Sequence, residues 1–220
     1  MRARCAVTSR PRPWLVSSLM SFSSLSVSTF LAQTAAKQPT PGGGAVAGLT
    51  GALAAALAHM VVNYSLNKKN LAQHQPLLED AAKRLERARA MLLELADEDA
   101  AAYGLVNELT KLPETDPRRI EQLPAALRAS VDVPLSVAAC ATDLLRLMRD
   151  LAGKSNAYLR SDLAIAAVLA EATARSAAWN VNINVPQLPI ATDREKVTQQ
   201  TRELVTHAKN LSAEVEAACV

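Results

Sequence analysis

The sequence has few aromatic residues, cysteines and histidines, and each shortage excludes a class of protein. Phenylalanine, tryptophan and tyrosine make up 3% of the 220 residues, which is too few for a protein that stacks nucleic-acid bases. The three cysteines and three histidines lie far apart. They fit neither a disulfide framework nor the ligand spacing of a metal site. We therefore expect no metal, no nucleic-acid partner and a reducing, cytoplasmic location.

The excess of positive charge is confined to the N-terminus. The formal net charge is +3, and residues 1–19 alone contain four arginines and no acid. The rest of the chain is thus close to neutral and offers no basic face for a phosphate backbone. We interpret 1–19 as an N-terminal extension, with Met20 as a plausible true start and an arginine-rich transit peptide as the alternative. Residues 20–220 are predicted to form a single domain.

The apolar residues, half of the chain, are mainly alanine, leucine and valine, which favours helices packed closely on helices. Apolar periodicity, caps and prolines predict six helices and no convincing strand. They span about residues 28–37, 43–66, 77–109, 117–151, 155–181 and 193–217. Ser28 and Asp193 are the expected N-caps of the first and last, and Pro124 and Pro134 the expected kinks or breaks in the fourth. The sequence therefore predicts an all-α, antiparallel bundle of about six helices.

One run without charge, residues 45–67, is long enough to cross a membrane. Small and polar residues interrupt it, and no aromatic belt flanks it. We therefore expect no membrane association, but a helix buried on all sides in a soluble bundle. We expect this helix to end near Asn67, a residue that tolerates the left-handed conformation.

Five of the seven glycines fall within residues 42–51, directly after two prolines. Free backbone N–H groups at such a helix start can bind an anion or lie close to another chain segment. Alternatively, the small residues that recur every fourth position allow close helix packing. We place Gly42, Gly43 and Gly44 against a ligand, and Gly48 and Gly51 in helix packing.

Six short blocks resemble, in order, those of the formiminotransferase-cyclodeaminase C-terminal family. These are residues 39–48 (PTPGGGAVAG), 97–103 (DEDAAAY), 111–113 (KLP), 133–135 (VPL), 153–163 (GKSNAYLRSDL) and 180–184 (NVNIN). The family includes formiminotetrahydrofolate cyclodeaminases and methenyltetrahydrofolate cyclohydrolases. The resemblance covers about residues 28–186. The chain departs from the family pattern at Ala45, Asn67 and Ser155, which leaves the exact activity open.

The resemblance implies an enzyme that opens or closes the one-carbon bridge between two folate nitrogens. It implies a reduced folate substrate, no metal or redox cofactor, and a homodimer. Because a base and a proton donor are needed, Asp99 and Asp162 are the catalytic candidates. The alternatives are a surface charge for Asp99 and a solvated first-turn acid for Asp162. The candidate substrate-binding residues are Gly42, Gly43, Gly44, Asn156, Ser161, Lys68 and Asn180, with Lys68 a candidate for the glutamate tail of folate.

Two alternatives stay open. Asp162 and Asn180 are 18 residues apart, or ~27 Å along one helix, so they cannot contact the same small ligand from one chain. Either the asparagines at 180, 182 and 184 are structural, which we favour for part of the cluster, or the site joins opposite ends of two chains. The second alternative concerns function, because the departures also fit a helical folate-binding or assembly module that has lost catalysis.

Overall fold

The computed structural model describes residues 21–220, so the expected extension, 1–19, and Met20 lie outside the described residues. Within 21–220 the chain forms six α-helices and four short 3-10 helices, without any strand. The α-helices are α1 (Val27–Ala35), α2 (Gly43–Asn63), α3 (Gln75–Leu109), α4 (Pro117–Leu151), α5 (Arg160–Asn184) and α6 (Ala191–Ala218). The 3-10 helices are η1 (Phe22–Ser24), η2 (Lys69–His74), η3 (Ala157–Leu159) and η4 (Val185–Gln187). The predicted all-α class is confirmed.

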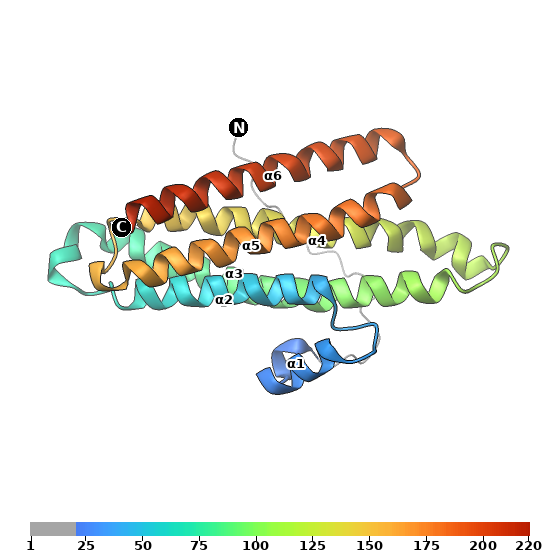
Figure 1. Ribbon diagram of the computed structural model, residues 1–220, viewed down its shortest axis with the longest axis horizontal. Helices are drawn as coiled ribbons and strands as arrows, with labels where there is room; N and C mark the ends of the chain where they lie inside the picture. The colour runs from blue at the N-terminus through green and yellow to red at the C-terminus, as the bar shows by residue number, and fades with distance from the viewer. Residues whose placement is uncertain (1–20) are drawn as a thin grey trace.

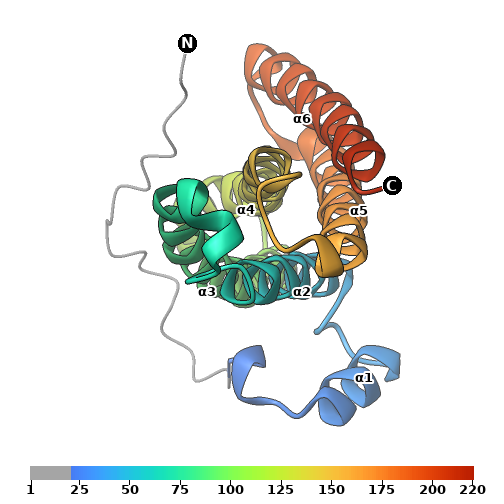
Figure 2. The same ribbon diagram turned by 90° about the vertical axis from the view of Figure 1, so that its left-hand side faces the viewer.

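Helices α2 to α5 form an antiparallel bundle, and α6 lies along α4 and α5 (Figure 1). Viewed end-on, α2 lies between α3 and α5, whereas α1 lies outside the bundle beside α2 (Figure 2). The core is a continuous cluster of alanine, leucine and valine, with Met148 as its one sulfur-containing buried member. Small core side chains allow the close helix approach that the composition predicts.

Several predicted helix boundaries are wrong. Helix α5 runs from Arg160 to Asn184 rather than over about residues 155–181, because the 3-10 helix η3 precedes it. Ser26, not Ser28, caps α1, and its Oγ accepts a hydrogen bond from the Thr29 N–H. Helix α6 begins at Ala191, so Asp193 lies in its first turn rather than at the cap. Helix α2 ends at Asn63. Asn67 does adopt the left-handed conformation, with φ 61°, but it does so in the loop that follows.

Pro124 and Pro134 do not break α4, which runs through both. Pro134 has no N–H, so the Ser130 carbonyl four residues earlier loses its partner within the helix. The Asn184 side chain supplies a replacement, because its Nδ2 donates to the Ser130 oxygen at 2.8 Å. Asn184 therefore has a structural role, which fixes the C-terminal end of α5 against α4.

Replacing Asn184 with alanine is expected to lower the free energy of unfolding by about 1–2 kcal/mol, because the partly buried Ser130 carbonyl loses its donor. Urea denaturation measures this loss. In a Pro134→Ala background the backbone N–H of residue 134 can satisfy the same carbonyl, so the loss should shrink. Equal losses in both backgrounds would contradict the assignment.

The glycines inside α2 confirm the packing interpretation. A Cβ on Gly48 would lie 2.9 Å from the Leu92 carbonyl oxygen, and one on Gly51 would lie 2.9 Å from a Thr173 methyl group. The backbone of α2 therefore packs directly on α3 and α5.

Helix α2 is long and apolar enough to cross a membrane by length and composition, and about half of its most apolar stretch is buried inside the bundle. The expectation of burial on all sides is wrong, however. Val46 and Leu53 are 38% and 55% exposed, so a stripe along α2 faces outward.

Candidate active site

The first turn of α2 brings together four of the predicted site residues from three helices. A Cβ on Gly44 would overlap the carboxylate of Asp99 on α3. A Cβ on Gly43 would lie 3.6 Å from Oδ1 of Asn180 on α5. Gly44 thus faces the Asp99 side chain itself, while Gly43 remains exposed. We predicted that these glycines lie against a ligand. At Gly44 the structure instead shows a close approach to Asp99, a candidate catalytic acid.

The local sequence leaves the start of α2 without a cap. Gly42 occupies the N-cap position, has no side chain to bond the first turn, and no acid follows it there. The first N–H groups of a helix have no acceptor within the helix. These N–H groups are therefore available to an oxygen atom of a ligand at this end of α2.

Burial raises the pKa of Asp99 to about 6 from an ordinary value of 3.8. Within residues 21–220 no hydrogen-bond donor or cation is paired with its carboxylate to counter this effect. A carboxyl group with such a pKa exchanges its proton near neutral pH, as a general acid or base must. Asp99 is therefore not an ordinary solvated surface charge.

Asp97, in the same acidic block, has a structural role that the sequence did not reveal. Its Oδ2 accepts a hydrogen bond from Ser21 Oγ at 2.5 Å, and its Oδ1 accepts one from the Phe22 N–H at 2.8 Å. The Phe22 ring packs edge-on against Phe30, which is buried among residues of α2 and α3. Asp97 thus anchors the N-terminal segment beside the site.

Four other predicted site residues lie at the opposite end of the bundle. Gly43 faces Asn180 and Gly51 faces Thr173, so α2 and α5 run antiparallel. Asp162, in the first turn of α5, therefore lies ~27 Å from Asn180 along the helix. Asn156, Ser161 and Lys68 lie at the same end as Asp162. One chain does not bring Asp162 to Asp99.

Asn156 forms hydrogen bonds with other residues of the same chain. Its N–H donates to Oγ of the buried Ser65 at 2.8 Å, and its Nδ2 donates to the Tyr64 carbonyl oxygen at 3.4 Å. Its Oδ1 accepts from the Tyr158 N–H. The residue is 8% exposed and joins the α2–α3 connection to the α4–α5 connection. Ser161 is exposed and Lys68 is partly buried.

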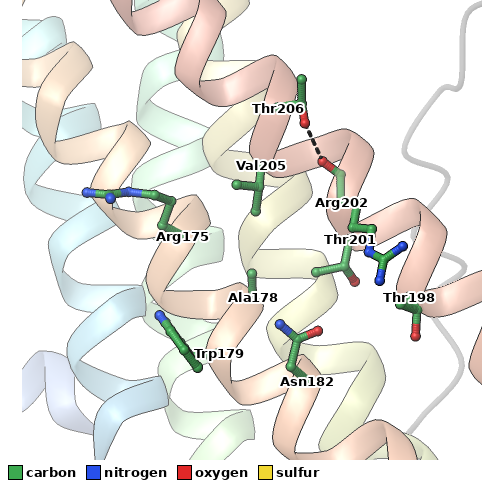
Figure 3. Close-up of a pocket in the computed structure, with 9 residues that line it drawn as sticks. All are labelled: Arg175, Ala178, Trp179, Asn182, Thr198, Thr201, Arg202, Val205 and Thr206. Carbon is green, nitrogen blue, oxygen red and sulfur yellow. Dashed lines mark hydrogen bonds between the residues drawn. The ribbon is translucent and has the colours of Figure 1, made fainter.

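Sequence reasoning also missed a hollow of about 610 Å³ between α5 and α6 (Figure 3). Its lining residues are Arg175, Ala178, Trp179, Asn182, Thr198, Thr201, Arg202, Val205 and Thr206. We call this hollow the α5–α6 groove. The only signal in the sequence is a tryptophan directly before the NVNIN block in a chain that has few aromatics.

The described residues provide no cluster for a metal ion. No group of three histidine, cysteine, aspartate or glutamate side chains between residues 21 and 220 has the geometry to hold one.

Comparison with known proteins places this arrangement in a family. The formiminotransferase-cyclodeaminase family model matches residues 26–206. The methenyltetrahydrofolate cyclohydrolase of Methylorubrum extorquens is 32% identical over 182 residues, which cover 81% of this chain and 86% of that protein. The formimidoyltransferase-cyclodeaminase of Mus musculus is 32% identical over 188 residues, 84% of this chain but 35% of that enzyme.

A solved structure has the same fold. The formiminotetrahydrofolate cyclodeaminase of Thermotoga maritima matches with a TM-score of 0.81 and 30% identity, over 90% of this chain and 96% of that one. Sequence and structure therefore agree with the resemblance carried by the six blocks. The chain belongs to the formiminotransferase-cyclodeaminase family.

Proposed function

We propose that this protein hydrolyses the methenyl bridge of methenyltetrahydrofolate, with Asp99 as the general base. The observation that carries the proposal is the Asp99 carboxylate, which has no partner within residues 21–220, is buried against Gly44 and has a pKa of about 6. The similarity to a methenyltetrahydrofolate cyclohydrolase over most of both chains supplies the substrate class.

The chemistry needs one proton acceptor near the carbon that water attacks. As the water oxygen bonds to the cationic methenyl carbon, the Asp99 carboxylate takes one proton from the water. The C–N5 bond then breaks, N5 receives that proton, and the remaining hydroxyl proton leaves to solvent. The product is a formyl group on N10. Because the methenyl carbon is already cationic, we propose that no metal or redox cofactor is required.

The experiment follows loss of the methenyl chromophore in the presence of purified full-length protein. We expect faster loss than in buffer, at a rate that a metal chelator leaves unchanged. The similarity to the Thermotoga cyclodeaminase favours a second candidate, release of ammonia from formiminotetrahydrofolate, in which the same carboxyl would donate a proton. Absence of turnover with both substrates, together with thermal stabilisation by reduced folates, would establish the inactive folate-binding module instead.

We further propose that the active unit is a homodimer whose sites join opposite ends of two chains. The exposed stripe of α2, with Val46 and Leu53, offers an apolar face to a second copy of the chain. A two-fold axis perpendicular to this face makes the two copies of α2 antiparallel. The Asp99 end of one copy then lies against the Asp162 end of its partner, which reunites the two groups of predicted site residues.

Mixing two inactive variants tests the shared site. Asp99→Asn and Asp162→Asn homodimers are each expected to be inactive. After subunit exchange, half of the dimers are mixed and each mixed dimer has one intact site, so activity should recover to about a quarter of the wild-type value. The assay is chromophore loss before and after co-refolding. No recovery, with mixed dimers shown by differently tagged chains, would contradict the shared site.

A further inference from the structure

We propose that the α5–α6 groove binds the aminobenzoylglutamate half of the folate, with Arg202 pairing to a glutamate carboxylate and Trp179 packing on the benzoyl ring. The identity of the ligand rests on the function proposed above. The existence, charge and position of the groove do not depend on that function.

The groove lies at the same end of α5 as the candidate active site. Trp179 and Asn182, which line the groove, flank Asn180 along α5, and Asn180 faces Gly43 at the start of α2. In a folate the aminobenzoyl ring is bonded directly to N10, one of the two nitrogens that hold the reacting carbon. A substrate with that carbon near Asp99 must therefore place its benzoyl ring within a few bonds of this end of α5. Among residues 21–220, the α5–α6 groove provides a hollow at this end of α5.

The groove supplies one guanidinium that is free to bind an anion. Arg175 is paired with Glu171 at 2.8 Å, and its side chain points away from the other lining residues (Figure 3). Arg202 has no ion-pair partner within residues 21–220. Its guanidinium lies near Thr198 on α6 in Figure 3. An exposed, unpaired guanidinium matches a carboxylate, which it can bind through two hydrogen bonds.

The aromatic wall of the groove is Trp179, with 77% of the residue exposed. It is the one tryptophan within the described residues. A large indole ring left open to solvent gains free energy when a flat apolar ring packs on it. Asn182 and Thr198 place amide and hydroxyl groups at the same hollow. The set of one cation, one aromatic ring and a few polar groups fits a benzoyl ring that carries an amide and carboxylates.

The experiment measures binding of aminobenzoylglutamate, which lacks the pteridine and the one-carbon unit and so needs no turnover. Titration is followed by Trp179 fluorescence in a Trp14→Phe background, where Trp179 is the remaining tryptophan. Arg202→Ala is expected to weaken binding by about tenfold or more, because a charge-assisted pair is lost. Lys196→Ala, which removes the same charge from another face of α6, is the matched control and should bind as the parent does. With methenyltetrahydrofolate, Arg202→Ala should raise KM and leave kcat unchanged.

Each other result has a defined meaning. Equal binding by Arg202→Ala and Lys196→Ala would overturn the proposal, as would loss of binding in Lys68→Ala alone. Turnover of methenyltetrahydrofolate without saturable binding of aminobenzoylglutamate would also overturn it while the proposed function stands. Arg202-dependent binding without turnover of either folate substrate would support the groove as a carboxylate site and reject the proposed function.

Discussion

Asp99→Asn should lower kcat/KM by about 10²–10⁴-fold, the range typical of a lost general base, and yet make the protein more stable at neutral pH. Asparagine has nearly the shape of aspartate but cannot accept the proton from water. It also cannot ionise in a buried position. The rate is measured from the methenyl chromophore, and stability from urea denaturation of the same preparations.

The direction of the stability change follows from the raised pKa of Asp99. The folded protein holds the proton with a pKa of about 6, against 3.8 for the ordinary carboxyl, so protonated Asp99 favours the folded state. This contribution is complete below pH ~4 and is lost as the pH rises through 6. Above that, ionised Asp99 lowers the free energy of unfolding by about 3 kcal/mol. Asp99→Asn should therefore gain up to that amount at pH 7.5 and nothing at pH 4.

Asp97→Asn is the matched control, two residues earlier on the same helix. Asp97 accepts hydrogen bonds from Ser21 and Phe22, so its replacement should reduce stability and leave kcat near the wild-type value. The wild-type rate should also rise with pH through an apparent pKa of about 6, because the ionised carboxylate is the active form. A full rate in Asp99→Asn, or a stability gain that persists at pH 4, would contradict the role assigned to Asp99.

The helices could be predicted from the sequence because local signals specify them. Apolar periodicity, prolines and the scarcity of aromatics gave six helices in the correct order, and Pro117 and Gly153 marked true boundaries. Several helix ends were missed by up to five residues. At α1 the reason is that the competing serines at 26 and 28 are equally good caps by type. Helix α4 continues through Pro134 because a side chain of α5 supplies a hydrogen-bond donor. No local sequence signal indicates that donor.

The candidate site was predictable in its residues but not in its geometry. The family-like blocks pointed to Asp99, Asp162 and Asn180 without showing which of them meet. The antiparallel packing of α2 and α5 decides this, and it pairs Asn180 with Gly43. Whether an acid is solvated or buried also depends on tertiary packing, so Asp97 and Asp99 look alike in sequence and differ in the structure. The α5–α6 groove is lined by residues from two different helices, and no sequence motif indicates it.

Gly44→Ala should lower the free energy of unfolding by about 1–3 kcal/mol, the usual effect of overpacking, and strongly reduce activity. In an ordinary helix interior the same change stabilises by about 0.5–1 kcal/mol. At Gly44 the added methyl group would occupy the position of the Asp99 carboxylate, so the carboxylate must leave the place where burial raises its pKa. Gly104→Ala is the control, because a Cβ there has no heavy atom within 4 Å. It should be neutral or stabilising and fully active.

A double variant separates steric overlap from a general intolerance of α2. Asp99→Ala removes the atoms that the new methyl group would meet, so Gly44→Ala should do little harm to stability in that background. Thermal and urea unfolding of the four proteins give the coupling energy between the two positions. A loss of the same size with and without the Asp99 carboxylate would place the defect elsewhere in the first turn of α2. Strong coupling would mean that Gly44 is glycine because Asp99 must lie against it, which links the glycine cluster directly to the proposed base.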